Sequence, residues 1–204
     1  MRRFFARIAV LVVGTAAFVA IGGVSTLLAT HNAVAAAAQP TDTVLAVVRT
    51  QLADTRRELD RAHEVLEFSS RYGIPADLSA QIYDIAVAEG IPASVGFQLV
   101  KVESGFQNTA QSPASAIGLT QLRVATARSY DPTVDPSDLM NANVNLKLGF
   151  RYLKDLLTRF DQNLPLALEA YNKGPTFVSA QQDSGMAVEG RYSKAVMSGI
   201  RRRG

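Results

Sequence analysis

The residues that could do chemistry centre on a glutamate at the end of a short apolar stripe. Val95, Leu99 and Glu103 lie four residues apart, so in a helix they share one face. Gly105 favours a helix end, which places Glu103 in the last turn, beside the negative end of the helix dipole. The apolar setting and the dipole both disfavour a carboxylate. We therefore predict a raised pKa for Glu103, as a general acid near neutral pH needs. The alternative is a surface glutamate that faces water.

The residue types that are missing exclude most other catalytic chemistry. The 204 residues contain no cysteine, which excludes disulfides, thiol nucleophiles, cysteine-ligated metals and a lipid-modified cysteine anchor. The only two histidines are His31, in the N-terminal leader, and His63, in a charged helix, so a histidine metal site or a Ser-His-Asp triad has almost no residues to use. We expect no metal and no cofactor. The chemistry must use carboxylates, hydroxyls, amides or lysine.

The positive charge of the chain belongs mostly to its N-terminus. The formal net charge is +3, and Arg2, Arg3 and Arg7 are the only charged residues among the first 38, so the remainder is formally neutral. The three arginines at 201–203 are more typical of a solvated tail than of a binding patch. We therefore expect no nucleic acid as a partner.

The N-terminal segment has the pattern of an export signal. Arginines precede an uncharged run from Ile8 to Ala29, which is long enough to span a bilayer. Residues 8–29 could therefore stay as an inner-membrane anchor. Ala36-Ala37-Ala38 offers a cleavage site instead, and the two interpretations remain open. In either case the rest of the chain is expected in the periplasm or cell envelope.

A long helix is predicted over residues 42–70, with Asp42 or Thr43 as its cap. Its apolar positions follow alternating spacings of three and four: Leu45, Val48, Leu52, Thr55, Leu59, Ala62 and Leu66. This stripe could form a dimeric coiled coil or pack on its own domain. We favour packing, because Thr55 and Ala62 interrupt the seam. A protein partner in an envelope complex is a further use for this helix, but no residue in it identifies one.

The rest of the chain is predicted to be helical. Glycines and prolines separate short amphipathic segments, and no run alternates as a strand would. The expected helices are 78–88, 92–104, 118–129, 143–160 and 165–172. The fold class is all-α. The predicted organisation is a signal peptide or membrane anchor at 1–38, a helical stalk at 39–72 and one domain at 73–200.

Several separated motifs resemble those of the soluble lytic transglycosylase catalytic domain, a lysozyme-like family. Their order and spacing match the family over about residues 75–195. The four main motifs are Glu103-Ser-Gly-Phe106, Ala110-Gln-Ser-Pro113, Ala116-Ile-Gly-Leu-Thr-Gln-Leu122 and Ala170-Tyr-Asn-Lys-Gly-Pro175. The helix from Asn143 and the segment Glu189-Gly-Arg-Tyr192 are also similar to the family.

The resemblance implies a function and a set of site residues. It implies cleavage of the β-1,4 bond between MurNAc and GlcNAc in peptidoglycan glycan strands, which leaves 1,6-anhydro-MurNAc. Glu103 would be the sole general acid and base. The residues that would bind substrate are Ser112, Gln121, Tyr171, Asn172 and Tyr192. Without the resemblance, Ser112 could serve only its turn, and Tyr171 could be a core residue.

The chain departs from the family at the groove. Ser115, Thr120 and Arg123-Val124 stand where the family commonly has Gly, Met and Met-Pro. Arg123 could pair with a carboxylate of the substrate or point to water. Two other functions remain as alternatives: a lysozyme-type muramidase, and a non-catalytic peptidoglycan-binding module of an envelope machine.

Overall fold

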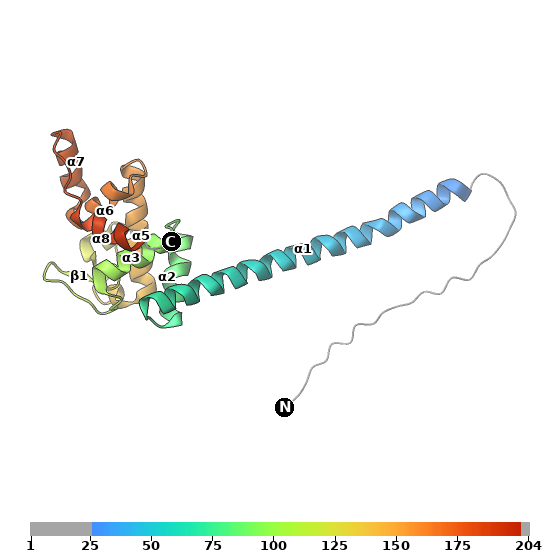
Figure 1. Ribbon diagram of the computed structural model, residues 1–204, viewed down its shortest axis with the longest axis horizontal. Helices are drawn as coiled ribbons and strands as arrows, with labels where there is room; N and C mark the ends of the chain where they lie inside the picture. Colours follow the sequence, from blue (N-terminus) through green and yellow to red (C-terminus); the bar gives the residue numbers. More distant parts are fainter. Residues whose placement is uncertain (1–25, 201–204) are drawn as a thin grey trace, which may run out of the picture. The chain divides into compact units, whose positions relative to one another are not determined.

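The computed structural model describes residues 26–200, with side chains from residue 42 onward, and this part of the chain is mostly helical (Figure 1). The expected all-α class is confirmed. The helices are α1 (Thr26–Tyr72), α2 (Ala76–Ala88), α3 (Ala93–Ser104), α4 (Val124–Arg128), α5 (Ala142–Arg159), α6 (Leu164–Lys173), α7 (Pro175–Asp183) and α8 (Arg191–Ile200). Two short antiparallel strands, β1 (Ala116–Ile117) and β2 (Leu122–Arg123), and a 3-10 turn, Asp138–Met140, complete it.

Helix α1 contains the predicted helix 42–70 but begins earlier, at Thr26. The predicted cap at Asp42 or Thr43 is therefore wrong. The alanine-rich stretch before these residues favours helix, so the helix continues through them. The chain divides within α1, after Arg56, into two compact units. The second unit contains the core and the site described below.

The part of the predicted apolar stripe that belongs to the second unit is exposed. Within that unit Leu59 and Leu66 are 68% and 60% exposed. The face that packs is offset from the stripe and contains Val65 and Phe68, at 6% and 1%. The interpretation of the stripe as a packing face is thus wrong for these residues.

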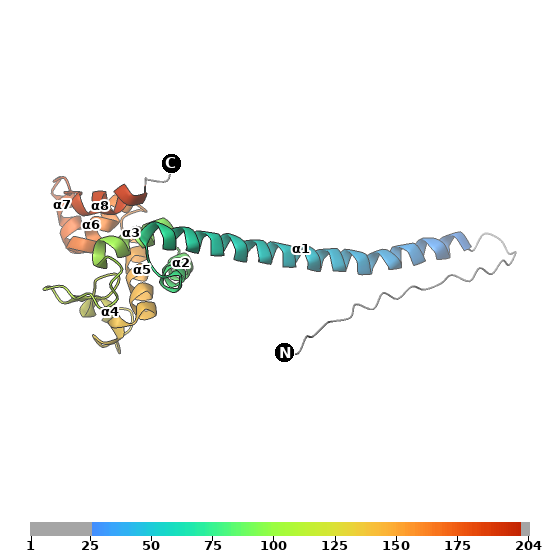
Figure 2. The ribbon, with the colours of Figure 1, turned by 60° about the horizontal axis from the view of Figure 1, so that its bottom comes forward.

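Helix α3 lies in the middle of the second unit, in contact with α2 and α8 (Figure 2). Its residues Phe97 and Leu99 are fully buried. The ring of Phe97 stacks on Phe68 of α1 with centroids 4.1 Å apart. A side chain at Gly96 would place a Cβ 3.1 Å from both Ala86 and Phe150, so glycine there lets α2 and α5 pack closely on α3. This packing fixes the axis of α3 and so the position of Glu103 at its end.

The predicted helix 118–129 is wrong. The segment forms β2 and only a short helix, α4. Gly118 and Gln121 have φ angles of 79° and 47°, which a right-handed helix does not allow. Helices α7 and α8 were not predicted. Pro175, which follows the predicted helix 165–172, is the first residue of α7, where proline is favoured.

The predicted signal peptide or membrane anchor falls mostly on residues that the structure does not describe. The predicted signal or anchor at 8–29 lies outside the described residues except for its last four, as does the arginine cluster at 201–203. Between residues 26 and 200, no helix combines the length and the apolar character needed to cross a bilayer.

Candidate active site

A groove of about 600 Å³ opens beside the C-terminal end of α3. Its walls come from five parts of the fold: the end of α3, the loop before β1, the strand β2, Tyr152 of α5 and the end of α6. Five of the six predicted site residues line it: Glu103, Ser112, Gln121, Tyr171 and Asn172. The sixth, Tyr192, reaches Glu103 from α8. The structure therefore brings together residues that are up to 89 positions apart.

Glu103 lies in the last turn of α3 and is half-buried. Burial raises the pKa of its carboxyl group from 4.5 to about 7, and the hydrogen bond from Tyr192 opposes this by lowering the pKa. The direction agrees with the prediction from the apolar stripe, whose members Val95 and Leu99 are buried. At neutral pH the carboxyl group is thus divided between its acid and base forms, as a group that must both donate and accept a proton requires.

Tyr192 lies in the first turn of α8, and its hydroxyl donates a hydrogen bond to Glu103 Oε1. Burial, and then the negative charge of Glu103, raise the pKa of this phenol well above its ordinary value. Tyr192 therefore stays protonated and can act as a donor throughout the neutral range. Tyr192 is thus a hydrogen-bond partner of the acid and does not itself line the groove.

Tyr171 and Gln121 each form hydrogen bonds to backbone carbonyl oxygens of the loop segment 110–120. The Tyr171 hydroxyl donates to the carbonyl oxygen of Thr120 at 3.0 Å, and its ring lies 5.1 Å from the ring of Tyr152. Gln121 donates through Nε2 to the carbonyl oxygens of Ala110 at 3.1 Å and Gly118 at 3.0 Å. The phenol oxygen and the amide Oε1 remain as acceptors for hydroxyl groups of a ligand.

Ser112 closes its own turn as well as lining the groove. Its Oγ accepts a hydrogen bond from the backbone N–H of Ala116 at 3.1 Å, and its N–H donates to the carbonyl oxygen of Ala116 at 2.9 Å. The turn explanation for this serine is therefore correct. Its hydroxyl proton is still available to a ligand, so the binding prediction stands beside it.

Two residues that the sequence analysis does not name as site residues bind the backbone of the loop 117–120, next to the groove. Asn145 of α5 is fully buried, and its Nδ2 donates to the carbonyl oxygens of Ile117 at 2.8 Å and Leu139 at 2.9 Å. Its Oδ1 accepts from both the N–H and the hydroxyl of Thr120, each at 2.8 Å. Ser104 joins α3 to the same loop by donating to the carbonyl oxygen of Leu119 at 2.8 Å. The motif containing Gly118 was visible in the sequence, but these partners come from distant segments.

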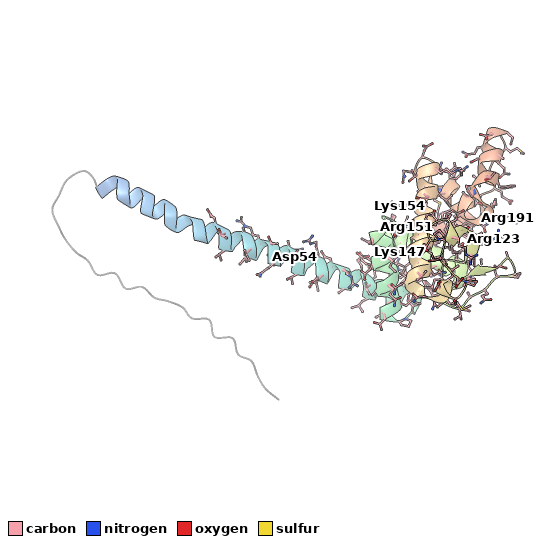
Figure 3. The ribbon with its side chains drawn as sticks, turned by 180° about the vertical axis from the view of Figure 1, so that it is seen from behind. Asp54, Arg123, Lys147, Arg151, Lys154 and Arg191 are labelled. Atoms are coloured by element: carbon pink, nitrogen blue, oxygen red, sulfur yellow. The ribbon has the colours of Figure 1, made fainter. Side chains whose placement is uncertain are left out.

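The departures from the family pattern have physical explanations in part. The Thr120 hydroxyl is used by Asn145, as described above. Ser115 has a φ of 58°, a conformation that favours glycine. Arg123, labelled in Figure 3, is exposed at the rim of the groove. Among the described side chains it has no ion-pair partner, so its charge is available to an anionic ligand.

Glu103 is the only carboxylic acid among the described residues that line the groove. The aspartates at 131, 135, 138 and 161 lie outside that lining. The part of the chain with described side chains also contains no cluster of three residues suited to a metal ion. Among the described residues, the groove therefore offers one carboxyl group for acid–base chemistry, with Tyr192 as its hydrogen-bond donor.

Comparisons with known proteins found several lytic transglycosylases. Over 91 residues the chain is 30% identical to the soluble lytic murein transglycosylase of Escherichia coli K12, which covers 42% of this chain and 14% of that protein. The solved 70 kDa soluble lytic transglycosylase of Escherichia coli matches with a TM-score of 0.50 and 24% identity, over 66% of this chain and 22% of that one.

An inactive variant of lytic transglycosylase Slt from Pseudomonas aeruginosa matches with a TM-score of 0.48 and 28% identity, over 59% and 20% of the two chains. This chain thus spans less than a quarter of the length of these relatives. The model of one family, described as the Transglycosylase SLT domain, matches residues 82–193, which is more than half of the chain. The chain belongs to the Transglycosylase SLT domain family.

Proposed function

We propose that residues 73–200 of this chain form a peptidoglycan lytic transglycosylase. It would cleave the β-1,4 bond between MurNAc and GlcNAc in glycan strands and leave a 1,6-anhydro-MurNAc end. Membership of the family and the relatives named soluble lytic murein transglycosylase support the reaction class. The observation that carries the proposal is a single groove carboxyl group, Glu103, whose pKa is raised to about 7.

One carboxyl group is sufficient for this reaction. The protonated Glu103 would donate its proton to the glycosidic oxygen while the bond from that oxygen to C1 of MurNAc breaks, which releases the GlcNAc hydroxyl. The resulting carboxylate would accept the proton of the muramoyl 6-hydroxyl as its oxygen bonds to C1. The proton balance of Glu103 is restored, and neither water nor a metal takes part.

Tyr192 would stabilise the intermediate stage of this sequence. Its hydroxyl donates to Glu103 Oε1, and a hydrogen bond to a carboxylate is stronger than one to a neutral acid. The interaction therefore gains strength when Glu103 has lost its proton. Ser112, Gln121, Tyr171 and Asn172 would bind the sugar hydroxyl and acetamido groups along the groove.

A lysozyme-type muramidase is the second candidate. Most glycosidases that transfer to water use two carboxyl groups, about 5–10 Å apart. Among the described residues no second carboxyl group lines the groove, which favours the transglycosylase. A non-catalytic binding module has no use for a half-buried acid that titrates near neutral pH, so it ranks third.

Mass spectrometry of digested peptidoglycan tests the proposal. Purified sacculi are incubated with the full 204-residue chain, with Glu103→Gln, and with Glu58→Gln as a control for an exposed glutamate on α1. We expect anhydro-muropeptides from the wild type and the control, and none from Glu103→Gln. Reducing ends that incorporate ¹⁸O from labelled water would identify a muramidase. Binding to sacculi without any release would leave only the binding module.

The substrate implies a location in the cell envelope. We propose that residues 1–38 direct export, since peptidoglycan lies outside the cytoplasm and these residues have the signal pattern. A fusion of residues 1–38 to alkaline phosphatase is expected to be active in a bacterial host. An inactive but stable fusion would contradict the export.

A further inference from the structure

A second carboxylate is buried behind the groove. Glu169 of α6 is 1% exposed, and its Oε1 accepts a hydrogen bond from the backbone N–H of Ser193 at 2.8 Å. Its Oε2 lies 3.0 Å from Nζ of Lys173, one turn further along α6. That buried oxygen has no other hydrogen-bond partner, so the ammonium group alone compensates it.

Glu169 is ionised at neutral pH despite its burial. Burial by itself would raise the pKa of this carboxyl group, but the hydrogen bonds from Ser193 and Lys173 lower it below its ordinary value. A buried charge is tolerated in a protein only when it is paired in this way. Glu169 does not line the groove, although its partner Lys173 does, so the carboxylate itself is placed to bind the protein and not a ligand.

Both members of the ion pair also bind the backbone at the start of α8. Ser193 is the third residue of that helix, and its N–H is one of the first groups that have no partner inside a helix. A carboxylate bound there also complements the positive end of the helix dipole. On the other side Lys173 donates to the carbonyl oxygen of Glu189 at 2.7 Å, just before α8 begins. Tyr192 lies between these two attachment points.

We propose that the Glu169–Lys173 ion pair is a positioning pair for the acid. It fixes the backbone on both sides of Tyr192, so that the phenol reaches Glu103 Oε1. The pair acts on Glu103 through Tyr192. Glu169 is buried away from the groove, whereas Lys173 also lines it, so the test is made on the protein without substrate. The effect on rate rests on the proposed function, whereas the effect on the pKa of Glu103 does not.

The proposal predicts a shift in the titration of Glu103. Because the hydrogen bond from Tyr192 lowers the pKa of Glu103, a loosened α8 must let that pKa rise above about 7. One hydrogen bond to a charged group corresponds to a shift of about one pH unit. We expect Lys173→Met to raise the pKa by this amount, and Tyr192→Phe to raise it equally. Lys173 is the safer position to change, because its side chain is 26% exposed and that of Glu169 only 2%.

The experiment follows the ¹³C carboxyl signal of Glu103 by NMR in the full chain. The variants are Lys173→Met, Tyr192→Phe and the two combined. Glu169→Gln/Lys173→Met removes both charges together, so that no unpaired charge remains buried. Arg71→Met is the matched control, because Arg71 and Glu67 form an ion pair with the same spacing of four residues on α1.

Lys173→Met should shift the titration in the wild-type background and not in the Tyr192→Phe background. A direct effect of the lysine charge on Glu103 would persist without the phenol. An equal shift in both backgrounds would therefore overturn the proposal. So would an unchanged pKa in folded Lys173→Met and in the variant without either charge, since a purely structural pair changes stability alone. Absence of anhydro products from the wild type would refute the proposed function and leave these results intact.

Discussion

Replacing Glu103 by glutamine is expected to stabilise the second unit of the chain at neutral pH and to have little effect in acid. The folded carboxyl group has a pKa of about 7, against 4.5 for the ordinary group. Between these values the folded state binds more protons than the unfolded state, so the free energy of unfolding falls as the pH rises. Below pH 4.5 the stability is fully present, and above pH 7 its loss is complete.

The size of the loss follows from the shift in pKa. Each pKa unit corresponds to about 1.4 kcal/mol, so a rise from 4.5 to about 7 gives roughly 3 kcal/mol. Glutamine is neutral at every pH and avoids this loss. For a protein of this size, 1 kcal/mol changes the Tm by about 2–4 °C, so at pH 8 the variant should melt roughly 6–12 °C above the wild type.

Urea unfolding followed by tyrosine fluorescence measures this difference. The chain has no tryptophan, and its six tyrosines all lie after residue 71, so the signal reports on the second unit. Unfolding free energies of the wild type, Glu103→Gln and the control Glu58→Gln are compared from pH 4.5 to 8. The wild-type and Glu103→Gln curves should diverge over this range. Curves that remain parallel would show that burial does not disfavour the Glu103 carboxylate and would refute the reasoning.

Three further measurements follow from the site. The alkaline limb of the pH–rate profile on peptidoglycan should fall near pH 7, where Glu103 loses its proton, and Tyr192→Phe should move it upward; a limb unaffected by this substitution would separate the two residues. Gly118→Ala should destabilise the fold by about 3 kcal/mol or more in urea unfolding, because the new Cβ would lie 2.3 Å from Asn145 Nδ2 at a φ of 79°. Ser115→Gly should raise the unfolding free energy by about 1 kcal/mol, because glycine adopts the φ of 58° without strain; a decrease would mean that the serine side chain compensates it.

The acid could be predicted from the sequence because its evidence is local. A spacing of four residues along one helix places Glu103 after Val95 and Leu99, and Gly105 marks the helix end. The same local reasoning failed at 118–129, because the left-handed conformation of Gln121 depends on the loop around it and not on its residue type.

The partners of the acid could not be predicted in the same way. Tyr192 is 89 residues from Glu103, and only the packing of α8 against α3 brings them together. The resemblance to the family supplied Tyr192 as a site residue but not its contact. No motif in the sequence marks Glu169, and its hydrogen bond to Ser193 of another helix is visible only in the structure.

The Asn145 network has a consequence for how this groove can change. One amide side chain joins three segments, and Gly149 leaves room for Thr120, whose Oγ1 would lie 2.3 Å from a Cβ there. A substitution at any of these positions therefore needs a compensating change at another, so their effects should be epistatic. The rim residues Ser112 and Arg123 have no such constraint from Asn145. Substitutions that change ligand preference should therefore be tolerated more readily at Ser112 and Arg123 than at Asn145, Thr120 or Gly149.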